Sequence, residues 1–405
     1  MHAGVANGGA SIRGESERRL GAVSGYRRRG RSAAEQGSTM TFEFGIFDSF
    51  DLGRGTPGEV IDARLRLAVE AERLGFEHYH ATEHHGTDLS VIPSPNLFLA
   101  ALSQRTERIR IGAMVYVLPA YEPLRLAEEI AVLDHLSGGR VDLGVGSGIS
   151  PIELGYFGVA DGAARGLYDR ALVALLDAWT TGVLQHPEHP DREHATLSVL
   201  PVQRPYPPLW YASSNPRTAE WAGRNAVSFL GRWNAGEFVQ TVDAYWRAWR
   251  DAAGDEGRLN AHVDAMPRVG PTTSVLIGES DAAARDRFLA VQEFYATRVL
   301  GLWHDHGIST FDAGFHGAVM LERGAAIVGT AESVRDQIVA QLELVDANVL
   351  EVQLYQGDMD LEESLSNLRG FAGIMPDIRS AAAALARGSD RVALAGAADA
   401  RVTTP

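Results

Sequence analysis

The stretch HYHATEHHGTD, residues 78 to 88, gathers four histidines, a glutamate and an aspartate. A neutral imidazole can take up or release a proton near pH 7, and imidazoles combined with carboxylates also bind metal ions. Residues two apart on a strand share a face, so His78 and His80, with His84 behind them, could converge on a metal ion. These side chains could therefore serve metal binding, proton transfer or neither.

The expected end of the strand separates these residues into two groups. The strand is predicted to end near Thr82, which leaves His78 and His80 deep in the fold as packing or hydrogen-bonded residues. The loop that follows carries Glu83, His84, His85 and Asp88. We interpret this loop group as proton-transfer chemistry and predict no metal site.

The composition excludes several classes of chemistry. The 405 residues contain neither cysteine nor lysine, which removes disulfides, thiolate zinc sites, cysteine nucleophiles and Schiff-base mechanisms. The absence of cysteine fits a cytoplasmic location, which we expect. A formal net charge of −15 disfavours nonspecific binding to nucleic acid or to a membrane surface. No apolar run is long enough to span a bilayer. We therefore expect neither nucleic acid nor a membrane as a partner.

The composition also divides the chain into three parts. Residues 1–39 are rich in Gly, Ser and Arg and lack apolar periodicity, which predicts a disordered extension without a catalytic role. Met40 precedes the first strand-like run and is typical of a natural start. Residues 40–380 form the predicted folded domain, and residues 381–405 are predicted to be a flexible C-terminal tail.

Within the domain, short β-rich runs alternate with amphipathic helical patterns, which indicates a mostly parallel sheet. Gly75 is predicted to end the first of these helices, and Gly138-Gly139 to end the helix that begins near Pro123. The predicted strands are FEFGIF (42–47), FEHYHAT (76–82), RIRIGAMVYVL (108–118), RVDLGVGSG (140–148), PPLWYAS (207–213), AVSFL (226–230), TTSVLIG (272–278) and VLEVQLY (349–355). Eight such units predict an α/β fold, a single (β/α)8 TIM barrel. The glycine-rich segment 300–330 after strand seven is too long for a plain connection and is predicted to be an inserted lid.

Two motifs at strand ends could contact a planar or anionic ligand. GVGSG (144–148) fails the dinucleotide pattern, because Ile149 stands where that pattern needs Gly or Ala. Close backbone approach to a ligand and a plain tight turn both stay open for it. ASSNPRTAEWAG (212–223) opens a helix whose dipole favours an anion, with an ordinary helix cap as the alternative. Its possible donors are Ser213, Ser214, Asn215 and Thr218.

Taken together, these stretches resemble the bacterial luciferase-like flavin-dependent monooxygenases, a family of (β/α)8 barrels. The resemblance covers about residues 40–380. It is strongest in GFEHYHATEHH, RIRIGAMVYVLPAYEPLRLAEEIAVLDHLSGGRVDLGVGSG, PVQRPYPPLWYASSNPRTAEWAG and VGTAESVRDQIVAQLELVDANVLEVQLY. Motif order, spacing and position in the barrel all agree, which makes the combination more specific than any single motif.

In that family, reduced FMN from a separate NAD(P)H:flavin reductase binds at the barrel mouth and reacts with dioxygen. The resulting flavin 4a-peroxide oxidises a small organic substrate. The resemblance therefore implies a monooxygenase with reduced FMN (FMNH2) as cofactor, a reductase as partner, a small-molecule substrate and a homodimer. Luciferase itself has an arginine and a reactive cysteine where this chain has GVGSG, so light emission from a long-chain aldehyde is not expected.

The resemblance also implies roles for individual residues. His84 would be the catalytic acid/base, supported by Glu83 and His85. The backbone of Met114 and Val115, joined by a non-prolyl cis peptide bond, would lie under the flavin ring. The remaining cofactor contacts would be Ser147 and Gly148 along the flavin, and Ser213, Ser214, Asn215 and Thr218 around its phosphate, where Arg165 or Arg170 can join.

Oxygen chemistry on a flavin requires that water be kept away, and the 300–330 segment is a candidate for that role. The substrate side could be lined by the aromatic residues Phe47, Tyr116, Tyr156, Trp233 and Trp303, although packing in the core is the alternative for each.

Three other functions stay open. A deazaflavin-dependent enzyme of the same fold would transfer a hydride without oxygen, although the EHH triplet favours FMN. A non-catalytic flavin-binding barrel is disfavoured by the intact triplet and the long lid. A hydrolase is a weaker alternative, because GVGSG places its serine one residue late for a nucleophile elbow.

Overall fold

The structure is a computed structural model that describes residues 42–388 apart from 235, 264 and 310–311. The predicted disordered extension, residues 1–39, lies outside the described residues, as does the last part of the predicted flexible tail. The first part of that tail is helical, because the last helix continues to Gly388. The described residues therefore contain the predicted barrel and the helix that closes it.

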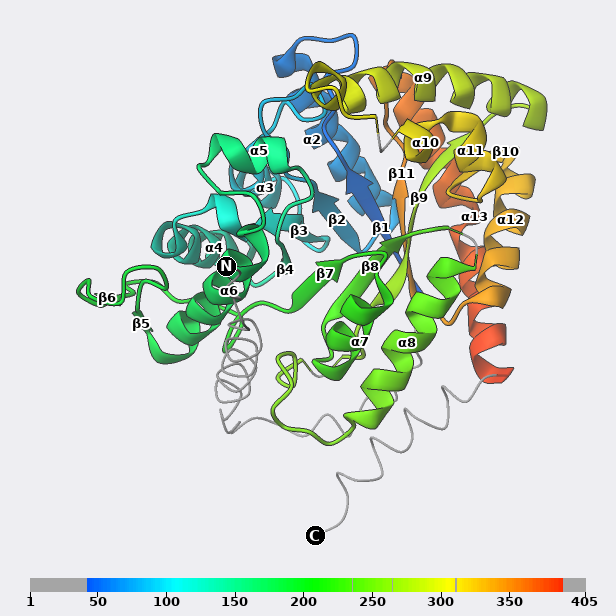
Figure 1. Ribbon diagram of the computed structural model, residues 1–405. Coiled ribbons are helices and arrows are strands. Elements are labelled where there is room, and N and C mark those ends of the chain that lie inside the picture. The colour runs from blue at the N-terminus through cyan, green and yellow to red at the C-terminus, as the bar shows by residue number, and fades with distance from the viewer. Residues whose placement is uncertain (1–41, 235, 264, 310–311, 389–405) are drawn as a thin grey trace, which may run out of the picture.

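Eight parallel strands form a closed barrel (Figure 1). They are β1 (Glu43–Asp48), β2 (His78–Ala81), β3 (Arg110–Val117), β4 (Val141–Gly146), β7 (Leu209–Ala212), β8 (Ser228–Arg232), β9 (Val269–Ile277) and β11 (Val349–Gln353). The strands pair in this order, and β11 returns to β1. The predicted (β/α)8 barrel is thus confirmed, and each predicted strand overlaps one of these eight.

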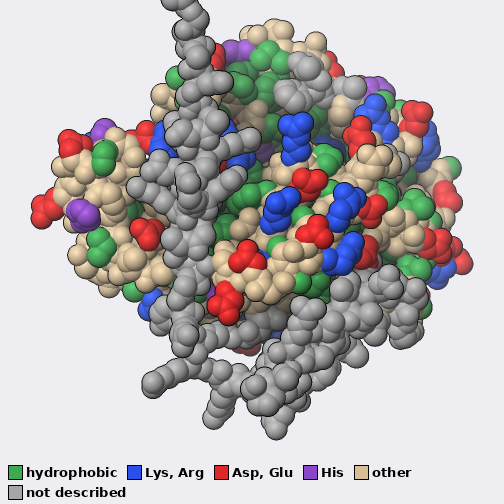
Figure 2. Space-filling model, turned by 60° about the horizontal axis from the view of Figure 1, so that its bottom comes forward, with side chains coloured by type: hydrophobic (Ala, Val, Ile, Leu, Met, Phe, Trp, Pro, Cys, Tyr) green, Lys and Arg blue, Asp and Glu red, His purple; other side chains and the backbone are tan. Residues whose placement is uncertain are grey.

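Helices surround the barrel on its outer side and also lie over the carboxyl ends of its strands, at the top of Figure 1. They are α2 (Pro57–Leu74), α3 (Pro95–Ser103), α4 (Pro123–Ser137), α5 (Pro151–Tyr156), α6 (Ala164–Thr181), α7 (Pro216–Arg224), α8 (Glu237–Asp251), α9 (Asp281–Asp305), α10 (Asp312–Phe315), α11 (Gly317–Glu322), α12 (Ala331–Leu344) and α13 (Leu361–Gly388), with a short 3-10 helix at Leu118–Ala120. Among the described residues, no helix is long and apolar enough to cross a membrane. Acidic and arginine side chains intermingle on the uncovered part of the face turned forward in Figure 2.

Three short strands lie outside the closed barrel. β10 (Ala326–Gly329) pairs with the end of β9, beyond the part of β9 that pairs with β8. β5 (Val183–Leu184) and β6 (Ala195–Thr196) form an antiparallel pair that closes the polar loop between them. This loop projects away from the barrel in Figure 1.

The helix ends follow local signals in the sequence. Thr56 caps α2 in a reciprocal arrangement, because its hydroxyl accepts from the Glu59 backbone N–H and the Glu59 carboxylate accepts from the Thr56 N–H. Such a cap stabilises a helix by about 1 kcal/mol. Gly75 ends α2 and Gly138 ends α4, both in the left-handed conformation that glycine adopts without steric cost. Both helix ends were predicted from the sequence.

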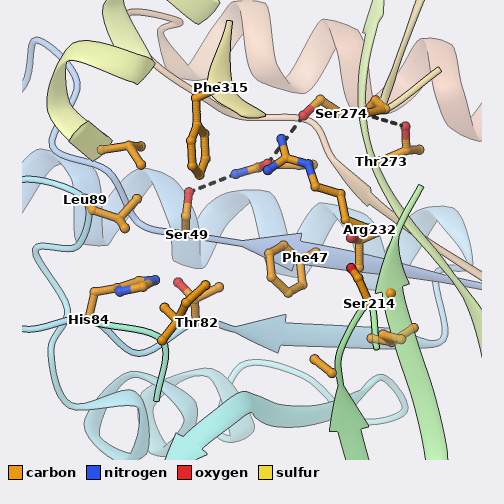
Figure 3. Close-up of a pocket in the computed structure, with 18 of the residues that line it drawn as sticks. Phe47, Ser49, Thr82, His84, Leu89, Ser214, Arg232, Thr273, Ser274 and Phe315 are labelled. Atoms are coloured by element: carbon orange, nitrogen blue, oxygen red, sulfur yellow. Dashed lines mark hydrogen bonds between the residues drawn. The ribbon is translucent and has the colours of Figure 1, made fainter. Parts of the chain in front are cut away.

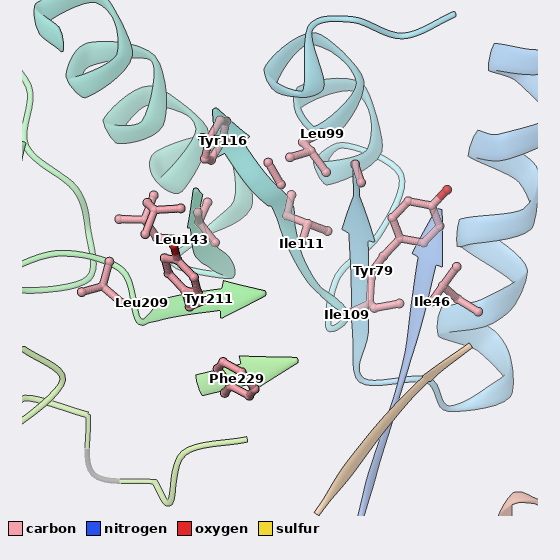
Figure 4. Packing of buried hydrophobic residues seen from close by; sticks show 14 of the residues in the cluster. Ile46, Tyr79, Leu99, Ile109, Ile111, Tyr116, Leu143, Leu209, Tyr211 and Phe229 are labelled. Carbon is pink, nitrogen blue, oxygen red and sulfur yellow. The ribbon is translucent and has the colours of Figure 1, made fainter. Parts of the chain in front are cut away.

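Strand alternation sorts the barrel residues into an outer and an inner layer. Outward-facing side chains such as Ile46, Tyr79, Ile111, Leu143 and Phe229 pack in the main hydrophobic core, which also includes helix residues (Figure 4). The Tyr79 ring, for example, stacks on Phe98 of α3 with 5.9 Å between ring centroids. This outer layer fixes the barrel, while the inner layer carries most of the polar chemistry.

The inner layer near the amino ends of the strands is a buried ion-paired network. His78 bonds to Asp142 through Nδ1 (2.9 Å) and to Glu43 through Nε2 (2.8 Å). His80 bonds to Glu351 through Nδ1 (2.5 Å) and lies 3.3 Å from Asp142 through Nε2. The prediction that His78 and His80 are buried, hydrogen-bonded residues is confirmed.

His78, His80 and Asp142 also offer ligand atoms within 4.8 Å of one another, which is close enough to hold a metal ion. Both nitrogens of each ring, however, already bond to carboxylates. Burial opposes the charge on His80, but Glu351 and Asp142 outweigh it and raise the pKa of His80 to about 9. Burial likewise opposes the charge on His78, but Asp142 and Glu43 raise the pKa of His78. A metal ligand must be a neutral imidazole, so a network that favours the protonated rings opposes metal binding.

The free energy of unfolding is expected to fall as the pH rises from about 6.5 to above 9. A group whose pKa is raised on folding stabilises the fold fully below its unfolded pKa and loses that contribution as the pH passes its folded pKa. For His80, with a pKa shift from 6.5 to about 9, the loss is at most about 3 kcal/mol. Urea denaturation across this pH range measures it.

His80→Gln tests this assignment, and His135→Gln, at an exposed histidine, is the matched control. Between pH 6.5 and about 9 no cysteine or lysine can titrate, because the chain has neither, and burial raises the pKa of Tyr79 well above its usual value. The His80 variant should show a flatter pH dependence than the His135 variant. Equal slopes in the two variants would contradict the assignment.

Candidate active site at the barrel mouth

Two cavities lie at the carboxyl ends of the barrel strands and share one wall. The large cavity, about 550 Å³, is lined mainly from the ends of β2, β3 and β4 and from α5. The small cavity, about 370 Å³, extends toward β8, β9 and α9 (Figure 3). The residues that line both are Phe47, Thr82, His84, Ile149, Glu153, Ala212, Ser213 and Ser214. Both volumes fall in the range of small-molecule sites.

His84 lies in the wall that the two cavities share. Its Nδ1 is 3.2 Å from Glu153 Oε1, and its side chain keeps 20% of its surface exposed. Within the described residues, Nε2 has no protein partner. An imidazole held at one nitrogen and open at the other can exchange a proton with a bound molecule.

The other two residues of the EHH triplet face different partners. The Glu83 side chain is fully buried and accepts from His85 Nε2 (3.0 Å) and from the Tyr121 hydroxyl (2.8 Å). The His85 ring packs edge-on against Phe157 at a centroid distance of 4.7 Å. These contacts hold the loop in place beside His84. Glu83 and His85 line the large cavity but not the small one.

Glu153 is a site residue that the sequence analysis missed. Its carboxylate bonds to His84 Nδ1 and accepts from the His85 backbone N–H (2.8 Å). Burial opposes ionisation, but the hydrogen bond from His84 and its charge prevail, so the pKa of Glu153 is lowered. A signal was present, because Ser150 caps α5 by accepting from the Glu153 N–H, and Ser-x-x-Glu marks a helix start.

The Met114–Val115 peptide bond is cis, as the family resemblance implied. The pairing of β3 with β4 shifts register at this point, between Ala113 and Tyr116. Both Met114 and Val115 line the large cavity.

The glycines of GVGSG allow β4 to approach this part of β3. A Cβ on Gly144 would lie 2.1 Å from the Ala113 carbonyl oxygen, and one on Gly146 would lie 2.3 Å from Val115 Cγ2. Gly146, Ser147 and Gly148 line the large cavity. The close approach at Gly144 and Gly146 is therefore to a neighbouring strand, an interpretation that the sequence analysis did not consider.

The predicted phosphate residues divide into two groups. Ser213 and Ser214 line both cavities, whereas Asn215 and Thr218 are not among the residues that line either. Asn215 caps α7, because its side-chain oxygen accepts from the Arg217 N–H at 3.0 Å. The ordinary cap is thus present, and anion binding by this helix end stays a prediction.

The two arginines considered for the phosphate also separate. Arg165 bonds to Asp169 at 3.0 Å and interacts with the hydroxyl of Tyr211, a residue that lines the large cavity. Arg170 instead pairs with Glu188 in the loop between β5 and β6. Arg165 is therefore nearer to the large cavity than Arg170, whose partner lies in the loop between β5 and β6.

The small cavity is covered from the α9 side. Tyr295, Val299 and Trp303 of α9 and Phe315 of α10 line it, so part of the predicted lid segment 300–330 reaches the site. Asp88 in the loop after β2 pairs with Arg298 of α9 and ties the cover to that loop.

The aromatic residues predicted for the substrate side have different positions. Phe47 and Trp303 line the small cavity, Tyr116 and Trp233 are core residues, and Tyr156 is exposed.

The family model of luciferase-like monooxygenases matches residues 41–347. The chain belongs to this family. An uncharacterized protein, y4wF, of Sinorhizobium fredii is 36% identical over 330 residues, which cover 80% of this chain and 93% of that protein. The 4-hydroxyprotoasukamycin monooxygenase of Streptomyces nodosus subsp. asukaensis is 28% identical, covering 70% of this chain and 77% of the relative.

Solved structures agree with this assignment. The monooxygenase RslO1 from Streptomyces bottropensis has a TM-score of 0.69 and 25% identity, covering 83% of this chain and 99% of that one. The oxygenating constituent of 3,6-diketocamphane monooxygenase from Pseudomonas putida, in complex with FMN, has a TM-score of 0.68, covering 83% of this chain and 98% of that one. At 18% identity it shares the fold. The luciferase-like family is flavin-dependent, and the chain is an oxidoreductase of it.

Gly146→Ala is expected to weaken flavin binding at least about tenfold, because the added Cβ would lie 2.3 Å from Val115 Cγ2 and force a shift in the wall of the large cavity. Gly155→Ala is the matched control, since a Cβ there meets nothing within 4 Å and alanine favours the helix. Fluorescence titration with FMN measures both affinities. Equal affinities for FMN in the two variants would show that the strand approach does not shape a flavin site.

Proposed function

We propose that this protein is a flavin-dependent monooxygenase that uses reduced FMN and dioxygen to oxidise a small organic substrate. The position of His84 carries the proposal, because one imidazole lines both cavities at the barrel mouth. A cofactor in the large cavity and a substrate in the small one would then meet at the same proton donor or acceptor. Membership of the luciferase-like family supports this division of roles.

The residues of the large cavity fit a reduced flavin. The Thr82 hydroxyl is buried in the wall and has no protein partner within the described residues, so it can bond to a ligand. Met114 and Val115 would lie against the ring, with Ser147 and Gly148 along it, while Ser213 and Ser214 offer hydroxyls nearby. When bound, reduced FMN supplies the electrons that activate dioxygen.

The protein groups around His84 would control a proton and keep water out. Glu153 accepts from Nδ1–H, which leaves Nε2 of His84 as the atom that gives or takes a proton at the cavity wall. Glu83 and His85 fix the loop through their mutual hydrogen bond. The α9 and α10 side chains form an apolar cover over the small cavity, which limits the access of water.

The proposal includes a separate NAD(P)H:flavin reductase that delivers the reduced cofactor. The description of the 3,6-diketocamphane enzyme as an oxygenating constituent supports such a division of labour. A homodimer and a cytoplasmic location stay predictions from the sequence analysis.

An anaerobic titration with reduced FMN, followed by rapid mixing with oxygenated buffer, tests the proposal. We expect binding of reduced FMN and a transient absorbance that outlasts the reoxidation of free FMN. Binding followed by immediate reoxidation would favour a hydride-transfer or binding-only role instead. Absence of FMN binding together with binding of deazaflavin F420 would replace the proposal with deazaflavin chemistry.

His84→Ala is expected to lower turnover at least about tenfold while leaving FMN affinity and the melting temperature close to those of the wild type. The matched control is His186→Ala, because His186 also pairs with a glutamate, Glu122 at 3.2 Å, but lies in the loop between β5 and β6. Stopped-flow absorbance and product analysis measure the effect. Near-normal turnover in the His84 variant would remove the proton-transfer role.

A further inference from the structure

Arg232 places a positive charge in the small cavity that the proposed proton chemistry does not use. It lies on the inner face of β8, two residues after Leu230, so strand alternation directs its side chain into the barrel mouth. In Figure 3, Arg232 and His84 stand on opposite sides of the cavity, with Phe47 between them. Arg232 does not line the large cavity.

No carboxylate pairs with Arg232 among the residues that the structure describes. Its guanidinium carbon lies 5.0 Å from the centroid of the Phe315 ring, and one of its nitrogens lies 3.7 Å from the Met320 sulfur. Burial lowers the pKa of Arg232, whereas hydrogen bonding to Glu363 raises the pKa of Arg287. An arginine remains protonated in either setting, so Arg232 is a desolvated cation that lacks a counterion.

The neighbouring polar groups of the cavity cannot neutralise this charge. Glu153 is the one acidic residue among the described lining residues, and it is engaged with His84 and the His85 backbone. The Gln353 amide donates to the Ser49 hydroxyl at 2.9 Å, which makes a neutral pair. The rest of the wall is largely apolar and includes Phe47, Leu89, Leu230, Val299, Trp303 and Phe315.

We propose that Arg232 binds the carboxylate of an organic acid, whose apolar body occupies the small cavity. A buried charge without a partner is costly, and a ligand carboxylate matches the planar guanidinium in a two-point contact. The inference rests on the proposed function in one respect, namely that the small cavity holds the substrate. It adds that the oxidised atom is remote from the carboxylate, because Arg232 and His84 lie on different sides of the cavity.

The test compares an acid with its neutral amide on the full-length protein. Isothermal titration calorimetry at pH 7.5 measures the binding of 4-phenylbutanoate and 4-phenylbutanamide, with and without FMN. The wild type should bind the acid at least about tenfold more tightly, since a hydrogen-bonded charge pair contributes more than a neutral one. Arg232→Met should lose this preference, and Arg232→Lys should keep part of it.

The matched control is Arg66→Met, because Arg66 is an exposed arginine of α2 whose pairing with Asp62 is loose, at 3.9 Å. It should bind both probes like the wild type. Equal affinity for acid and amide, no measurable binding of the acid, or an unchanged preference in Arg232→Met would overturn the inference. A merely structural role of Arg232 would weaken both probes equally and would overturn it as well.

These outcomes are separable from those for the proposed function. A protein that stabilises the oxygen-dependent flavin absorbance but ignores the carboxylate contradicts only the inference about Arg232. A protein that prefers the acid but binds no reduced FMN contradicts only the proposed monooxygenase.

Discussion

The interior of a closed parallel barrel must be filled and electrically balanced by the inward-facing residues of its strands, and the rest of this structure depends on that constraint. Near the amino ends, His78 and His80 and their carboxylate partners form a buried ion-paired floor. The Trp210 ring packs against both imidazole rings, at centroid distances of 5.1 Å to His78 and 4.8 Å to His80. The two cavities that share His84 lie at the opposite, carboxyl ends of the strands, where the loops converge.

The same histidine-rich stretch therefore serves two purposes. The alternation of β2 puts His78 and His80 inside the barrel, where carboxylates from β1, β4 and β11 bond to their rings and raise the pKa of both. Two residues beyond Thr82, the chain has left the strand, and His84 meets Glu153 from the helix that follows β4. The first pair of histidines fills and balances the barrel interior, whereas His84 keeps one ring nitrogen open at the wall of both cavities.

The small cavity combines an apolar cover with an unbalanced charge. The residues of α9 and α10 that shield it come from the long connection after β9, and Arg232 of β8 lies against Phe315 of that connection. An apolar cover keeps the local dielectric low, which makes the need for a counterion at Arg232 greater. Under the two proposals, water exclusion and anion recognition would both follow from this one arrangement, and both would select what binds beside the flavin.

By itself, the sequence determined the barrel, its eight strands, the helix ends at Gly75 and Gly138, and the flavin-dependent family. These features depend on local periodicity, on caps and on motif order, all of which are properties of neighbouring residues along the chain. Through the family resemblance, it also predicted a place for the EHH triplet at the barrel mouth and a cis peptide bond between Met114 and Val115.

Only the tertiary structure decided what those residues contact. Glu153 lies 69 residues from His84 in the chain, and the Arg232 side chain is isolated only because of which strands and helices surround it. The glycines of GVGSG likewise leave room for a different strand, β3, because side chains there would overlap Ala113 and Val115. Contacts between distant segments, and the lack of a partner for a charge, arise from packing, which the order of residues along one segment does not specify.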